Sequence, residues 1–135
     1  MARRAGEAGL EAIADIAMRR LYPPAMAAEH LDAFAERRAR FIETDPAVLG
    51  QACSILAALD IRDEVRRMDI PLLAAVGEWD EATPPAMAEE LASLVTRATF
   101  SLIEGCAHVP TIRAPDRFCD LVEQFASNNP DTAMI

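Results

Sequence analysis

Pro71-Leu-Leu-Ala-Ala-Val-Gly-Glu-Trp-Asp80 and Ala98-Thr-Phe-Ser-Leu-Ile-Glu-Gly-Cys-Ala-His108 are the two segments that decide the fold of this chain. Each is a short apolar run that predicts a buried strand, breaks at a glycine and ends in an ionisable residue. One helical stretch separates them, so the order is strand–helix–strand, which indicates two neighbouring parallel strands. Asp80 and His108 are then expected at the same edge of the sheet, where an acid can orient a histidine and where open α/β sheets bind ligands.

Three motifs around these residues resemble a known family. They are Gly77-Glu-Trp-Asp-Glu-Ala-Thr-Pro-Pro85, Glu104-Gly-Cys-Ala-His-Val-Pro110 and Ala114-Pro-Asp-Arg-Phe118. Together they resemble the C-terminal part of the α/β-hydrolase fold, and most closely the 3-oxoadipate enol-lactonase type. The resemblance extends over nearly the whole chain and is firmest over residues 67–127. The paired motif is fairly specific for the fold and says little about the substrate.

The resemblance implies an α/β fold class and a division of the chain into parts. We expect a partial α/β-hydrolase fold, in which a helical cap precedes a strand–helix–strand–helix unit with parallel strands. Residues 1–66 would form the helical cap-like region, residues 67–127 the C-terminal segment of the hydrolase core, and residues 128–135 a flexible tail. A plain helical subdomain fits the periodicity of the first part equally well.

The same resemblance implies that Asp80 is the acid of a catalytic triad and that His108 is its base. Such an acid accepts a hydrogen bond from Nδ1 of the histidine, which then takes a proton from the nucleophile. The alternatives are a turn aspartate that bonds its own backbone and a loop histidine that bonds a carbonyl group. Glu78 and Glu81 are nearby rivals for the acid. The family pattern selects Asp80.

The nucleophile of the family sits in a G-x-S-x-G motif on a strand-to-helix turn, and this sequence contains no such motif. None of its serines is flanked by glycines at that spacing; they are Ser54, Ser93, Ser101 and Ser127. The sequence therefore predicts an ester or lactone hydrolase fragment, or half of a split enzyme, that is inactive alone. The alternative is a non-catalytic binding or assembly module derived from a hydrolase.

The remaining candidate groups favour structural roles. Cys106 lies close to His108 but is expected to be a small packed residue rather than a nucleophile, and Cys53 and Cys119 are expected in the core. The cysteines are odd in number and lack metal-ligand spacing, so neither a metal nor a cofactor is predicted. His30 is expected on the surface of the cap. Trp79 either lines a pocket mouth or covers the strand end.

Helix signals are clear elsewhere in the chain. The periodicity predicts helices over residues 8–20 and 25–43, and a third from Pro46, with Asp45 as its N-cap. The helix between the strands is predicted to begin with Thr83 as N-cap and Pro84 in the first position. A last helix is predicted over residues 115–126. The apolar residues assigned to buried faces of these last helices are Met87, Leu91, Leu94, Val95, Phe118, Leu121, Val122 and Phe125.

Composition narrows the classes of partner. The 135 residues are 52% hydrophobic, enough for a real core, and the net charge is -9. That charge argues against binding to nucleic acid or to an anionic membrane. No apolar run approaches the roughly 20 residues of a membrane helix, and no signal peptide is evident, so a cytoplasmic location is predicted. The arginines at positions 37, 38, 40, 66 and 67 are expected on solvated helix faces rather than at a site that binds a substrate carboxylate.

The first strand predicts an assembly partner. Leu72-Leu-Ala-Ala-Val76 carries no charge and is apolar on both faces, as in a strand covered on both sides. In the resembling family this strand pairs with an earlier strand that the sequence lacks, so one edge would stay open. Natural proteins cover or charge such edges. We expect a companion chain that brings the nucleophile, or a homo-oligomer formed through this edge.

Overall fold

The computed structural model describes residues 7–21 and 31–130. The chain divides into two compact units, Met1–Asp60 and Ile61–Ile135. The assignment of residues 1–66 as a cap-like region stays a prediction. The start of the second predicted helix, His30 and most of the predicted tail lie outside the described residues.

The described part of the first unit consists of helices, which are α2 (Glu11–Leu21), α4 (Leu31–Ile42) and α5 (Pro46–Ala58). Leu10 and Ile13 are buried and pack against Phe41 and Leu49. The predicted N-cap of α5 is confirmed, because the Asp45 carboxylate accepts a hydrogen bond from the backbone N–H of Ala47 at 2.7 Å. That bond satisfies one of the amide groups that a helix start leaves unpaired.

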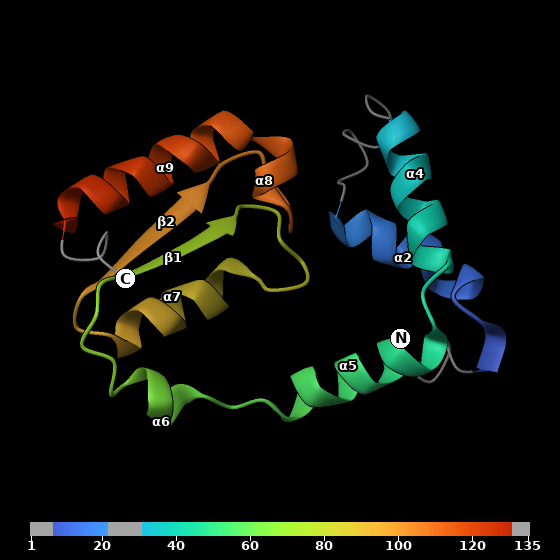
Figure 1. Ribbon diagram of the computed structural model, residues 1–135, viewed down its shortest axis with the longest axis horizontal. Coiled ribbons are helices and arrows are strands. Elements are labelled where there is room, and N and C mark those ends of the chain that lie inside the picture. Colours follow the sequence, from blue (N-terminus) through green and yellow to red (C-terminus); the bar gives the residue numbers. More distant parts are fainter. Residues whose placement is uncertain (1–6, 22–30, 131–135) are drawn as a thin grey trace. The chain divides into compact units, whose positions relative to one another are not determined.

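The second unit has the predicted parallel strand–helix–strand–helix arrangement (Figure 1). Its elements are α6 (Arg62–Val65), β1 (Leu72–Gly77), α7 (Pro85–Leu94), β2 (Ala98–Ile103), α8 (Pro110–Arg113) and α9 (Pro115–Asn128). The register runs from Leu72 opposite Ala98 to Gly77 opposite Ile103. Both strands therefore end at the same level, and the loops that follow them start side by side.

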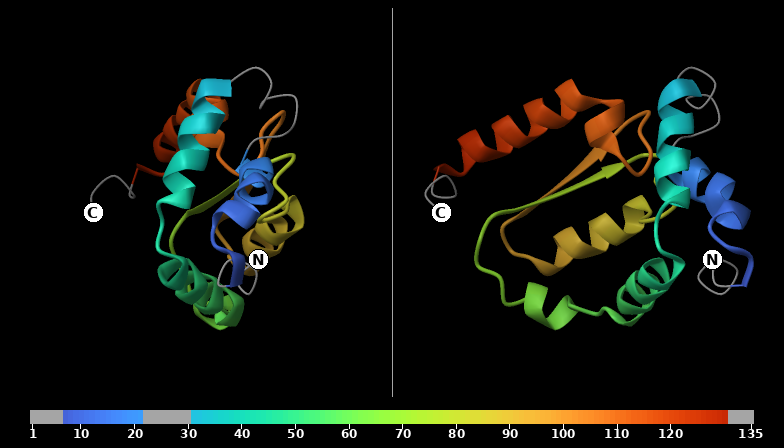
Figure 2. Two further views of the ribbon diagram at one scale, coloured as in Figure 1. Left: turned by 90° about the vertical axis from the view of Figure 1, so that its right-hand side faces the viewer. Right: turned by 45° about the vertical axis from the view of Figure 1, so that its right-hand side comes forward.

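The two helices longer than one turn in this unit, α7 and α9, lie on opposite sides of the sheet (Figures 1 and 2). Buried side chains of the strands, Ala74, Val76 and Ile103, form the core together with Val95 at the end of α7. This layered arrangement leaves the carboxyl ends of both strands free for the loops that follow them. Among the described residues, no helix is long and apolar enough to cross a membrane.

The predicted buried faces of α7 and α9 are only partly right. Met87 is 56% exposed and Val122 is 42% exposed, while Cys119, predicted in the core, is also exposed. The other predicted core residues of these helices, apart from Val95, are half-buried: Leu91, Leu94, Phe118, Leu121 and Phe125. The physical reason is the width of the sheet. Strands lie about 4.8 Å apart, so two of them cover a single row of side chains on each helix.

Candidate active site

Asp80 occupies a tight turn directly after β1. Its side chain is only 5% exposed. Oδ1 accepts hydrogen bonds from the backbone N–H groups of Ala82 at 2.8 Å and Thr83 at 2.9 Å, and Oδ2 accepts one from the Thr83 hydroxyl at 2.8 Å. The turn therefore holds the carboxylate in one orientation.

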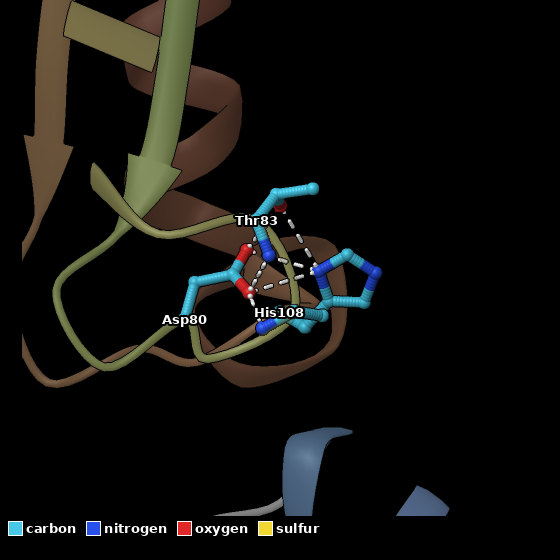
Figure 3. Close-up of polar contacts among 4 residues, drawn as sticks. Asp80, Thr83 and His108 are labelled. Atoms are coloured by element: carbon cyan, nitrogen blue, oxygen red, sulfur yellow. Dashed lines mark hydrogen bonds and ion pairs between the residues drawn. The ribbon is translucent and has the colours of Figure 1, made fainter. Parts of the chain in front are cut away.

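His108 follows β2 after a turn in which Gly105 adopts a φ of +68°, a conformation that favours glycine. Its Nδ1 lies 2.9 Å from Oδ2 and 3.1 Å from Oδ1 of Asp80 (Figure 3). The structure thus brings the two predicted site residues together. A carboxylate only accepts, so the hydrogen-bond network assigns the ring hydrogen to Nδ1. Nε2, at the opposite end of the ring in Figure 3, then carries the lone pair of a base.

The loops that carry the two residues are tied to each other. The backbone N–H of Trp79 donates to the carbonyl of Cys106 at 2.8 Å, and that of Glu78 donates to Ile103 at 3.1 Å. The Glu78 carboxylate accepts from the N–H of Gly105 at 3.0 Å. Glu78, a rival for the acid in the sequence, therefore fastens the histidine loop, while the other rival, Glu81, is exposed.

Hydrogen bonds set the charge of Asp80. Burial raises the pKa of Asp80, but the hydrogen bonds from the Thr83 backbone, His108, the Thr83 hydroxyl and Ala82 outweigh it, so the pKa lies below its ordinary value of 3.8. The carboxylate is ionised at neutral pH and suited to stabilise a protonated histidine beside it.

This shift predicts how stability depends on pH. Because the folded pKa of Asp80 lies below its ordinary value, the ionised carboxylate stabilises the fold at pH values above that ordinary value, and this stabilisation is lost as the pH falls through the folded pKa. In Asp80→Asn, the free energy of unfolding should therefore fall less steeply than in the wild type below about pH 4. Urea unfolding followed by Trp79 fluorescence measures this, with Glu81→Gln as the reference carboxylate variant. If the free energy of unfolding depends on pH in the same way in the wild type and in Asp80→Asn, the lowered pKa of Asp80 is contradicted.

The structure gives the other candidates different surroundings. Burial raises the pKa of the Cys106 thiol despite the positive charges of Arg117 and Arg113, which disfavours a nucleophilic thiolate. Cys53 is half-buried. Trp79 is 50% exposed, so it still fits both predicted roles, lining a pocket mouth and covering the strand end.

Serine and arginine side chains engage local partners. The hydroxyls of Ser54 and Ser93 donate to carbonyl groups of their own helices. Arg38 pairs with Glu11 and Asp15 within the first unit, and Arg66 pairs with Asp63. In the part of the chain that the structure describes, no cluster of His, Cys, Asp or Glu could hold a metal ion.

Thr83 is the site residue that the sequence assigned to another role. The prediction that it caps the following helix is wrong: α7 begins at Pro85, its N-cap is Pro84, and no side-chain bond caps it. The hydroxyl donates to Asp80 instead. The ionised carboxylate is the stronger acceptor, and the two prolines delay the helix start. The signal in the sequence was the spacing of Asp80 and Thr83, which suits a turn closed by its own side chains.

Comparisons with known proteins agree with this geometry. No family model matches the chain. It is 32% identical over 78 residues to the pimeloyl-[acyl-carrier protein] methyl ester esterase of Serratia marcescens, a match covering 58% of this chain and 31% of that protein. The enol-lactonase of Burkholderia xenovorans LB400 superposes with a TM-score of 0.87 at 27% identity, over 93% of this chain and 48% of that one.

A thermophilic esterase from Thermogutta terrifontis has the same fold, with a TM-score of 0.78 at 23% identity, over 94% of this chain and 47% of its own. The chain thus spans about half the length of these solved structures and about a third of the curated relative that it matches. The strand–helix–strand–helix unit, its parallel register and these likenesses lead to one assignment. The chain has the α/β-hydrolase fold and corresponds to the C-terminal part of that fold.

Proposed function

We propose that this chain supplies the acid and the base of an ester or lactone hydrolase, Asp80 and His108, and that the nucleophile comes from a companion polypeptide. The observation that carries the proposal is the 2.9 Å contact between Nδ1 of His108 and Oδ2 of Asp80. That contact leaves Nε2 directed away from the acid (Figure 3). A histidine held in this way can act as a base toward a hydroxyl that approaches Nε2.

The proposed chemistry assigns one step to each group. Nε2 of His108 takes the proton of the nucleophile hydroxyl as that oxygen attacks the carbonyl carbon of the ester, and Asp80 stabilises the imidazolium. The imidazolium then gives its proton to the departing alkoxide as the carbon–oxygen bond breaks. Water repeats the sequence on the acyl intermediate. The donors for the developing oxyanion are proposed to lie on the companion as well.

A chimera tests this proposal. The half of the B. xenovorans enol-lactonase that precedes the region matched by this chain is joined to, or co-expressed with, this chain. We expect hydrolysis of p-nitrophenyl acetate by the combination and none above background by the purified chain. Turnover by the chain alone that His108→Ala and Asp80→Asn both abolish would overturn the need for a companion, and Cys106→Ser would then be the next variant to measure.

One observation favours a second function, that of a binding or assembly module. The backbone N–H groups of Leu72 and Glu78 donate toward the β2 side of the strand. Because backbone groups alternate in direction along a strand, those of Leu73, Ala75 and Gly77 point toward the other edge. Within residues 7–21 and 31–130, β1 pairs with no strand except β2. A partner strand would satisfy these backbone groups.

This edge predicts a matched pair of proline variants. We expect the purified chain to associate, and Ala75→Pro to shift it toward monomer, because the N–H that proline removes points away from β2. Ala74→Pro removes an N–H directed at β2 and should unfold the unit. Size-exclusion chromatography with light scattering measures the mass across a range of concentrations. A wild-type chain that is monomeric at every concentration would exclude association through the edge.

A further inference from the structure

Thr83 contacts both members of the acid–base pair (Figure 3). Its hydroxyl oxygen lies 2.8 Å from Oδ2 of Asp80 and 3.4 Å from Nδ1 of His108. Its backbone N–H donates to Oδ1 of Asp80 at 2.9 Å. A single residue therefore holds both carboxylate oxygens, and its hydroxyl lies beside the ring nitrogen that the carboxylate faces.

The Thr83 hydroxyl has one hydrogen to give and two acceptors near it. The carboxylate oxygen is both nearer and charged, so it takes that hydrogen. A lone pair of Oγ1 then faces Nδ1, beside the two carboxylate oxygens at 2.9 and 3.1 Å. Three oxygen lone pairs repel an unprotonated nitrogen. The arrangement thus favours a hydrogen on Nδ1 and leaves the lone pair on Nε2.

We propose that Thr83 is a positioning residue that fixes the orientation of Asp80 and, through it, the Nδ1–H tautomer of His108. The inference deepens the proposed function, on which its catalytic meaning rests. The hydroxyl is free for this task because α7 begins at Pro85 and takes no side-chain cap. Without the hydroxyl, Oδ2 keeps only its contact with Nδ1 of His108, and the turn holds the carboxylate through the backbone bonds to Oδ1 alone.

The experiment uses the purified chain with ¹⁵N-labelled histidine. NMR shifts of the two ring nitrogens, recorded where the ring is neutral, give the ratio of Nδ1–H to Nε2–H tautomers. In Thr83→Val, which keeps the shape but removes the hydroxyl, this ratio at His108 should fall by about tenfold, the effect of losing one charge-assisted hydrogen bond. Thr83→Ser should restore the wild-type ratio. Thr99→Val, the same change on the exposed start of β2, should leave the ratio unchanged.

Several outcomes would overturn the inference. A wild-type tautomer ratio in folded Thr83→Val means that the hydroxyl does not determine the tautomer of His108. If Thr83→Val does not fold, Thr83→Ala takes its place and must show the same loss. Failure of Thr83→Ser to show the wild-type ratio means that the hydroxyl alone does not set the tautomer, and it also rejects the proposal.

The tautomer measurement needs no nucleophile, so it is independent of the chimera. A tautomer shift in Thr83→Val together with an inactive chimera would reject the proposed hydrolase function and keep the positioning role. An active chimera without any tautomer shift in Thr83→Val would support the proposed hydrolase function and reject the positioning role. In an active chimera, Thr83→Val should lower kcat more than it raises KM, because the base acts in the transition state.

Discussion

In the active chimera, His108→Ala should lower kcat by on the order of 10⁵ to 10⁶-fold, since a triad without its base retains only binding and oxyanion effects. Asp80→Asn should lower kcat by about 10⁴-fold, because an amide can donate to Nδ1 and so favour the wrong tautomer. The rates are measured with p-nitrophenyl acetate under saturating conditions. These are the largest losses expected from single side chains in this molecule.

The second histidine of the chain provides the control. His30→Ala should leave kcat within about twofold of the unsubstituted chimera, because the proposed chemistry uses only His108 and the sequence predicts a surface position for His30. Residual activity above about one per cent in His108→Ala would place the base elsewhere and contradict the assignment. The double variant His108→Ala with Asp80→Asn should be no slower than His108→Ala alone, since residues that act as one unit are not additive.

The sheet and the meeting of the site residues were predictable from the sequence because they depend on local patterns. The two apolar runs became β1 and β2, which end at Gly77 and Ile103. Strands joined by one helix run parallel, so residues that follow their carboxyl ends meet at one edge. The contact of Asp80 with His108 follows from that topology together with the family pattern.

Burial and the role of Thr83 were not predictable in the same way. An apolar position on a helix shows which face turns inward but not how wide the opposing surface is, so Met87 and Val122 are more exposed than expected. A threonine just before two prolines fits a helix cap and a partner of Asp80 equally well. The choice depends on where the carboxylate lies in three dimensions, and the structure places it within 2.8 Å of the hydroxyl.

Gly77 is the position where the smallest substitution should do the most damage to folding. It ends β1 directly beneath the loop that carries His108. A Cβ built on Gly77 would overlap the carbonyl oxygen of Ala107 and lie 2.7 Å from that of Cys106. Both neighbours are backbone atoms, and Cys106 is held by its bond from the N–H of Trp79 at 2.8 Å. The loop can yield only by breaking that bond or by moving His108.

Gly77→Ala should therefore reduce the free energy of unfolding by about 3 kcal/mol or more, at the upper end of overpacking costs. Urea unfolding followed by the fluorescence of Trp79 measures it in the unit concerned. The matched control is Gly50→Ala in α5, where a Cβ meets nothing within 4 Å. That change should stabilise its helix by about 0.5–1 kcal/mol and leave the Trp79 transition in place. If Gly77→Ala unfolds at the wild-type urea concentration and keeps the 2.9 Å contact between His108 and Asp80, the histidine loop is not held against β1 in the way that its backbone bonds indicate.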